Sequence, residues 1–159
     1  MIRAGPALPG FEDWAGLHDL LAQCFGPMEG RIAPPSSFAA MTPDTLRAKA
    51  AGEVLILAHD GDRLVGCAFC APRIDHLYLG KLAVAPLHRR QGVLRRMLAE
   101  ADAVARRRGL PALVLKTRVE LAETHATFAA LGFQQTGTEA HPGFDRPTSL
   151  AFRRAVALP

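Results

Sequence analysis

Cysteine, lysine, tryptophan and tyrosine are scarce in this chain of 159 residues. The three cysteines, Cys24, Cys67 and Cys70, are scattered, and they form neither an even disulfide set nor the spacing of a metal site. This pattern predicts a protein of a reducing compartment that uses no metal. There is no apolar stretch of eighteen residues and no charged leader followed by an apolar run, so we expect a cytoplasmic protein without membrane contact.

A nucleic-acid-binding function is disfavoured by the same scarcity. The net charge of +4 arises because sixteen arginines and three lysines outnumber fifteen acidic residues. A basic surface attracts nucleic acid, but proteins that hold single strands usually add aromatic side chains on which bases stack. The chain has one tryptophan and one tyrosine, and no known nucleic-acid motif accompanies its arginines. Nucleic-acid binding therefore stays as the less favoured alternative.

The segment from Leu79 to Gly109 is the most informative one, because a strand, a basic turn and a long helix follow one another there. The apolar spacing of the strand over 77–85 slips by one at Gly80-Lys81, which predicts a β-bulge that splays the strand from its neighbour. A helix is predicted from about Gln91, with apolar residues three and four apart on its buried face: Leu94, Met97, Leu98, Ala101, Val104 and Ala105. Free N–H groups at a helix start, next to arginines, predict a phosphate site.

Two motifs in this half of the chain resemble those of one enzyme family. The run Arg89-Arg90-Gln91-Gly92-Val93-Leu94 is similar to the R-x-x-G-x-G/A turn of the GCN5-related N-acetyltransferase (GNAT) family. Further on, Glu123-Thr124-His125, then Phe128 and Leu131-Gly132-Phe133, resemble the C-terminal motif of that family, a helix closed by a "GF" pair. The resemblance covers roughly residues 53–155. It implies an enzyme that transfers an acetyl group from acetyl-CoA to an amine acceptor in a ternary complex.

The resemblance also implies which residues hold the cosubstrate. The diphosphate of acetyl-CoA would lie on the turn, and its pantetheine arm would pair with the backbone of the splayed strand and contact the second motif. The residues concerned are Leu82, Ala83, Val84, Arg89, Arg90, Gln91, Gly92, Val93, Leu94, Thr124 and Phe128. Gly92 has no Cβ, so a diphosphate can approach the backbone closely there. Leu94 stands where the family usually has glycine or alanine, which keeps the amide but adds a larger side chain.

The catalytic residues are less evident than the cofactor site. Direct transfer needs a neutral amine and a proton for the departing thiolate. Family members often take that proton from a tyrosine in the second motif, but the matching residue is Phe128, which has no proton to donate. Tyr78, the only tyrosine, and His125 are the candidate catalytic residues. Asp75, His76 and Glu123 are the other ionisable groups expected near the cleft, and water-mediated proton transfer is a further alternative.

Periodicity and turn signals predict the rest of the fold. Helices are expected over 12–25, over 43–51 with Thr42 as N-cap and Pro43 in the first turn, and over 121–131. Strands are expected over 54–58, 64–71, 112–117, 133–138 and 148–153. The apolar share of 49% can fill one core, so we expect a single α/β domain over 1–159, with a mixed central sheet and helices on both faces.

Two further interpretations stay open. The same fold could serve as a non-catalytic acyl-CoA sensor, which would bind the thioester without turnover. The resemblance is also compatible with a homodimer, whereas the acceptor amine is left unidentified by the sequence because one fold supports many acceptors.

Overall fold

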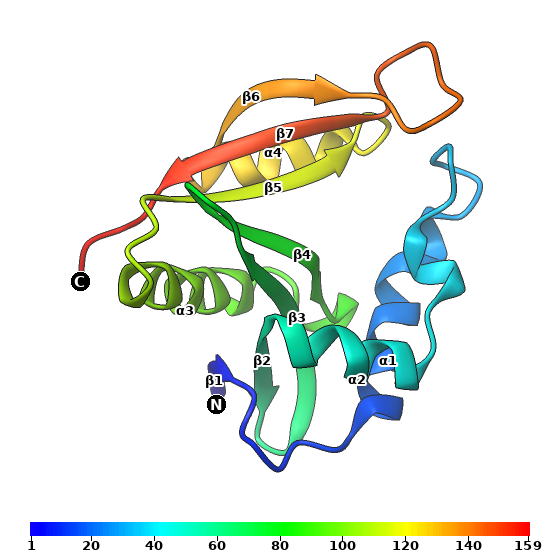
Figure 1. Ribbon diagram of the computed structural model, residues 1–159. Helices are drawn as coiled ribbons and strands as arrows, with labels where there is room; N and C mark the ends of the chain where they lie inside the picture. Colours follow the sequence, from blue (N-terminus) through cyan, green and yellow to red (C-terminus); the bar gives the residue numbers. More distant parts are fainter.

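The computed structural model describes residues 1–159 and has a central sheet of seven strands in the order β1-β2-β3-β4-β5-β7-β6 (Figure 1). The strands are β1 (Ile2–Pro6), β2 (Val54–Asp60), β3 (Arg63–Pro72), β4 (Leu77–Val84), β5 (Ala112–Arg118), β6 (Gln134–Glu139) and β7 (Ser149–Ala155). All neighbouring pairs are antiparallel except β4 and β5, which are parallel. The predicted mixed sheet is confirmed.

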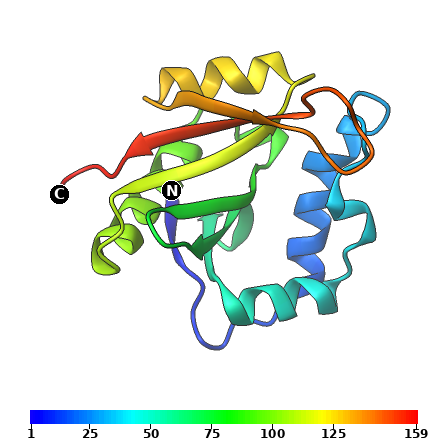
Figure 2. The same ribbon diagram turned by 45° about the horizontal axis from the view of Figure 1, so that its top comes forward.

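Four helices cover the two faces of this sheet, as predicted. They are α1 (Trp14–Phe25), α2 (Pro43–Gly52), α3 (Val93–Arg107) and α4 (Ala122–Ala130). Helices α1 and α2 lie on the opposite side of β2–β4 from α3 (Figure 1), and Figure 2 shows α4 against the β5–β7–β6 half of the sheet. Thr42 caps α2 in a reciprocal capping box with Thr45, which confirms the predicted N-cap.

One strand was absent from the sequence-based prediction. Residues Ile2–Pro6 form β1, which pairs antiparallel with β2 from Ile2↔Asp60 to Pro6↔Ile56. The segment has five residues, and Gly5 and Pro6 are both poor strand formers, so no alternating pattern marks it. Pro6 is tolerated because β1 is an edge strand.

The start of α3 also differs from the prediction. Gly92 is the N-cap, with the left-handed backbone angles φ 81° and ψ 7°, so the helix begins at Val93 rather than at Gln91. The buried face then includes Val93, which is 1% exposed, while the predicted core residue Leu94 is half-buried. The helix lies close to the sheet because Gly66 of β3 faces Val93 and Met97, where an added Cβ would come within 3.1 Å of either side chain.

The buried face of α3 contains one charge that the apolar pattern did not reveal. Asp102 is 4% exposed, and its carboxylate accepts hydrogen bonds from the Arg154 guanidinium at 2.5 Å and from the backbone N–H of Ala157 at 3.2 Å. This pair joins α3 to β7 and the segment that follows it. Because both partners are largely removed from water, removing one would leave the other charge buried and uncompensated.

We expect Arg154→Ala to lower the free energy of unfolding by about 3–5 kcal/mol, the usual cost of breaking a buried ion pair. Arg153→Ala is the matched control. The guanidinium of Arg153 lies 3.7 Å from an Asp75 carboxylate oxygen at the surface, and such an exposed pair should contribute at most about 1 kcal/mol to the free energy of unfolding. Urea unfolding of both variants measures the difference. Equal losses would show that the Asp102–Arg154 pair adds no more than an exposed pair.

The three cysteines are unpaired and buried. Burial raises the pKa of the Cys70 thiol to about 12 and raises the pKa of Cys67 further. Both thiols are therefore protonated at neutral pH, as expected of core cysteines of low reactivity. None of the helices combines the length and the apolar character needed to cross a bilayer.

Candidate functional site

The predicted phosphate turn, residues 89–94, has a backbone shaped for an anion. Arg90 (φ 64°) and Gly92 (φ 81°) are both left-handed, so two of three consecutive residues depart from helical or extended geometry. No side chain caps α3 at Gly92. The N–H groups of a first helical turn have no intrahelical partner, and here no side chain replaces it. These groups also carry the positive end of the helix dipole. An anion at this point would receive several N–H donors at once.

Two side chains of the turn hold it in place. Arg89 Nε donates to the carbonyl of Val84 at 3.3 Å, and Gln91 Nε2 donates to the carbonyl of Leu87 at 3.0 Å. The side chain of Arg90 has no such contact and is exposed. Within the predicted phosphate-binding set, Arg90 and the backbone amides are thus the groups free to meet an anion, while Arg89 and Gln91 fix the geometry.

Strand β4 leaves its neighbour β5 soon after the two meet. Only Leu77↔Leu113 and Tyr78↔Val114 pair between them. The register between β3 and β4 shifts between Cys67↔Ala83 and Phe69↔Gly80, and Lys81 at this bulge has φ 48°. The predicted slip at Gly80-Lys81 and the splaying of the strand are both confirmed. The β5-facing edge of β4 beyond Tyr78 is unpaired, and it leads through Leu82 and Val84 towards the phosphate turn.

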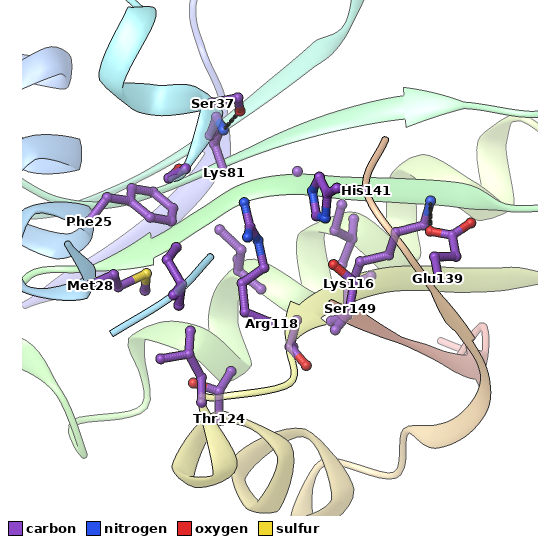
Figure 3. Close-up of a pocket in the computed structure, with 18 of the residues that line it drawn as sticks. Phe25, Met28, Ser37, Lys81, Lys116, Arg118, Thr124, Glu139, His141 and Ser149 are labelled. Carbon is purple, nitrogen blue, oxygen red and sulfur yellow. Dashed lines mark hydrogen bonds and ion pairs between the residues drawn. The ribbon is translucent and has the colours of Figure 1, made fainter. Parts of the chain in front are cut away.

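The gap between β4 and β5 opens into a cavity of about 780 Å³ (Figure 3). Its walls come mainly from five parts of the chain: β4, β5, the α1–α2 connection, α4, and the loop after β6. In Figure 3 Thr124 lies at the end formed by α4, Lys81 and Ser37 lie at the other end, and Arg118 lies between them. Leu82, Thr124 and Phe128, three of the predicted cofactor contacts, line the cavity.

Helix α4 presents two of these residues on one face. Thr124 is half-buried, and Phe128 is 7% exposed with its ring centroid 5.7 Å from that of Phe133. Phe128 therefore belongs both to the core and to the cavity wall. A rigid aromatic wall at this position suits the apolar part of a ligand, whereas the Thr124 hydroxyl can form a hydrogen bond with it.

Tyr78 lines the cavity near the point where β4 and β5 separate. Its ring lies under the Lys116 ammonium, which is 5.6 Å from the ring centroid. Burial raises the pKa of the Tyr78 phenol, and the nearby Lys116 opposes this only in part. The phenol is therefore protonated at neutral pH and can act as a hydrogen-bond or proton donor.

His125, the second predicted catalytic residue, does not line the cavity. Its Nε2 lies 2.8 Å from the Arg118 carbonyl oxygen, so the ring donates a hydrogen bond there, and it packs 5.9 Å from the Phe152 ring. These contacts join α4 to β5 and β7. Asp75 and His76, also considered from the sequence, form a 2.7 Å pair with each other and lie outside the cavity wall.

His141 lines the cavity and was not a candidate in the sequence-based prediction. Its backbone N–H donates to Thr148 Oγ1 at 2.9 Å, and its Nδ1 contacts the same oxygen. The Thr148 hydroxyl donates to the Glu139 carbonyl at 3.3 Å. When that hydroxyl donates its single proton to Glu139, Nδ1 of His141 is the donor to Thr148, and this tautomer leaves Nε2 as a proton acceptor.

The surroundings of His141 favour the neutral ring. Partial burial, and then the positive charges of Arg118 and Lys116, lower the pKa of His141 below the ordinary histidine value, although Glu139 acts in the opposite direction. A neutral imidazole with a free Nε2 is a suitable general base near pH 7. The only sequence signal was a His-Pro-Gly loop between two strands, which gives no indication that the loop reaches the cavity.

No three side chains of His, Cys, Asp or Glu come together in an arrangement that could hold a metal ion. The titratable side chains that line the cavity are one imidazole, one phenol, one carboxylate and three basic groups.

A family model described as the Acetyltransferase (GNAT) family matches residues 14–133. No curated protein matches the chain in sequence. Solved structures match its fold over nearly its whole length. One is the PaiA N-acetyltransferase of Thermoplasma acidophilum in complex with coenzyme A, with TM-score 0.81 and 12% identity over 98% of this chain and 99% of that chain.

Two other solved structures are similar in fold. The ribosomal-protein-S18-alanine N-acetyltransferase of Escherichia coli has TM-score 0.73 and 18% identity, covering 100% of this chain and 96% of that one. A GNAT family acetyltransferase of Elizabethkingia anophelis with acetyl-CoA bound has TM-score 0.68 and 17% identity, covering 97% of each chain. At these identities the likeness extends to the fold and leaves the acceptor open.

Proposed function

The chain belongs to the GNAT acetyltransferase family, and from this premise we propose that it is an N-acetyltransferase that transfers the acetyl group of acetyl-CoA to a primary amine in a ternary complex. The observation that carries the proposal is the open edge of β4. It begins at the phosphate turn and ends in a cavity that contains both a proton acceptor and a proton donor. We treat residues 1–159 as one catalytic domain and infer a cytoplasmic location from its three unpaired thiols.

The cosubstrate would lie along this edge. The diphosphate would accept hydrogen bonds from the amides at Gly92, Val93 and Leu94, with added charge from Arg90. The pantetheine amides would pair with the backbone of Leu82, Ala83 and Val84 in the manner of an added strand. Thr124 would donate a hydrogen bond to the arm, and Phe128 would pack against its thiol end.

The reaction then needs three proton transfers: the acceptor ammonium loses a proton before attack, its nitrogen loses a second as the amide forms, and the departing thiolate gains one. His141 Nε2 would remove a proton from the acceptor ammonium, and the resulting amine would attack the thioester carbonyl to form the N–C bond. An N–H group of β4 at the bulge would stabilise the oxyanion. The C–S bond would then break, the departing thiolate would take a proton from the Tyr78 phenol, and the new amide nitrogen would return its extra proton through water to the phenolate.

Turnover distinguishes this function from the sensor alternative. Purified protein with acetyl-CoA and a broad panel of amines should release free thiol, detected with a thiol-reactive dye, at a rate that depends on the amine. Tight acetyl-CoA binding without amine-dependent release from any amine would favour a sensor instead. Salt-sensitive binding to DNA or RNA that coenzyme A does not displace would favour the nucleic-acid alternative.

We expect Tyr78→Phe to lower kcat on the order of a hundredfold or more, because the variant keeps the ring beside Lys116 but removes the proton donor. His125→Gln should stay within a few-fold of the parent, since its amide can still donate to the Arg118 carbonyl. Initial rates at saturating acetyl-CoA decide between the two residues. A few-fold effect at both positions would assign neither as the acid and would favour proton transfer through water.

A further inference from the structure

The charges of the cavity wall are unbalanced. Its basic residues are Lys81, Lys116 and Arg118, and its only acidic residue is Glu139. Lys116 Nζ lies 2.7 Å from a Glu139 carboxylate oxygen, so these two charges compensate each other. Neither Lys81 nor Arg118 forms an ion pair with a carboxylate, although the negative charge of Glu120 lies close enough to Arg118 to raise its pKa against the effect of burial. Two cations thus line the cavity with no carboxylate in direct contact, and Glu120 itself lies outside the cavity wall.

The Arg118 guanidinium has N–H groups that form no hydrogen bond within the chain. Its two terminal nitrogens donate to the carbonyl oxygens of Pro34 and Pro35, at 2.6 Å and 3.2 Å, and this ties the α1–α2 connection to β5. A guanidinium has five N–H groups, so three remain after these two bonds. Because the carbonyl partners are neutral, the bonds hold the side chain in place without compensating its charge. The result is a fixed cation beside His141 (Figure 3).

Lys81 is held in a similar way at the other end of the cavity. The bulge in β4 directs its side chain towards the α1–α2 connection, where the ammonium donates to Ser37 Oγ and lies 5.6 Å from the Phe25 ring centroid. Burial, and then the charges of Lys49 and Arg118, lower the pKa of Lys81. An anion placed between Lys81 and Arg118 would offset both the lost hydration and the mutual repulsion of these two cations.

We propose that the acceptor is a small amine that also carries a carboxylate, and that Lys81 and Arg118 bind this carboxylate while the amine faces His141 and the thioester. This inference rests on the proposed function and narrows its substrate class. A carboxylate matches the flat fork of Arg118 and can bridge to the Lys81 ammonium. A cavity of about 780 Å³ that must also admit the thiol end of the cofactor suits an acceptor of amino-acid size rather than a folded protein.

The test uses matched pairs of amines that differ only in the negative charge. Each natural amino acid, together with longer amino acids whose amine and carboxylate are further apart, is assayed beside its carboxamide and its methyl ester. We expect at least one free acid to be acetylated with kcat/KM more than about tenfold above both neutral partners, as charge-assisted hydrogen bonds require. Equal or better rates for the neutral partners would overturn the inference and leave the acetyltransferase function standing.

Two conservative variants then test whether Lys81 and Arg118 cause the preference for a free carboxylate. Lys81→Met keeps most of the length of the side chain, and Arg118→Lys keeps the charge but loses the fork. Each should raise KM for the free acid about tenfold or more, with affinity for acetyl-CoA unchanged by calorimetry. Arg146→Gln removes a positive charge from an exposed position outside the cavity and is the control. Loss of acetyl-CoA affinity in Lys81→Met or Arg118→Lys would instead assign these cations to the cofactor.

The carboxylate site can also be tested if the protein proves not to be an acetyltransferase. If no amine is acetylated, calorimetric titration of the acetyl-CoA complex with N-acetyl amino acids still reports on the carboxylate site. Binding that Lys81→Met or Arg118→Lys weakens would support an anion site in a protein that is not an acetyltransferase. Absence of binding by every carboxylate would overturn the inference as well.

Discussion

Gly92→Glu is expected to abolish measurable acetyl-CoA binding, a loss of affinity of more than a hundredfold, while the sheet and its helices stay folded. Gly92 is exposed and left-handed, and a Cβ added there would meet no other atom within 4 Å. The new side chain would therefore extend into the space in front of α3. Its negative charge would take the place of the diphosphate and satisfy the amides that otherwise bind it.

The backbone cost must be separated from the effect of charge. A residue other than glycine at φ 81° costs about 1–2 kcal/mol, and this strain alone could shift the turn. Gly92→Asn is the matched control, since asparagine tolerates the left-handed region and carries no charge. We expect Gly92→Asn to bind acetyl-CoA within about tenfold of the parent in calorimetry. Unchanged affinity in Gly92→Glu would place the diphosphate elsewhere.

The backbone features of the proposed cofactor half could be predicted because their signals are local. The slip in apolar spacing at Gly80-Lys81 indicates a bulge within one strand. The order of a strand, a basic turn and an apolar helical pattern indicates where a helix starts. Both were confirmed. The precise first residue of α3 was wrong because the left-handed Gly92 moves the helix start by two residues. The rest of the predicted buried face is as expected, so the difference is confined to the first turn, where Val93 is fully buried and Leu94 only half-buried.

The acceptor half could not be predicted in the same way. Arg118, His141 and Lys81 are separated in sequence and meet only because β4 and β5 diverge and two connections fold over the gap. The sequence pattern indicates only a strand end at Arg118 and a loop at His141, and it marks Lys81 as part of a bulge without indicating where its side chain lies. His125, in contrast, lies in a recognisable motif, yet its ring donates a hydrogen bond to the Arg118 carbonyl and does not line the cavity. Sequence spacing identified the helix of that motif but not the direction of the side chain.

His141→Gln is expected to lower kcat/KM at pH 7 on the order of a hundredfold, the usual contribution of a general base. The glutamine preserves the size and can still contact Thr148, but it cannot accept a proton at neutral pH. The same variant should retain its affinity for acetyl-CoA and its melting temperature, because His141 is partly exposed and lies outside the phosphate turn. A loss of cofactor affinity would assign His141 to binding instead.

The pH profile tests the role of His141 most directly. Its pKa lies below the ordinary histidine value of about 6.5, so the ring is charged and inactive only in acid and is neutral at pH 7. The parent enzyme should therefore lose kcat/KM as the pH falls through a midpoint below about 6.5. In His141→Gln this acidic limb should vanish, and the residual rate should rise towards high pH as the acceptor amine deprotonates by itself. His59→Gln is the control, because burial also lowers the pKa of His59 but this residue lies outside the cavity wall. If the limb persists in His141→Gln, another group removes the proton, and the cavity offers only Glu139 for that role.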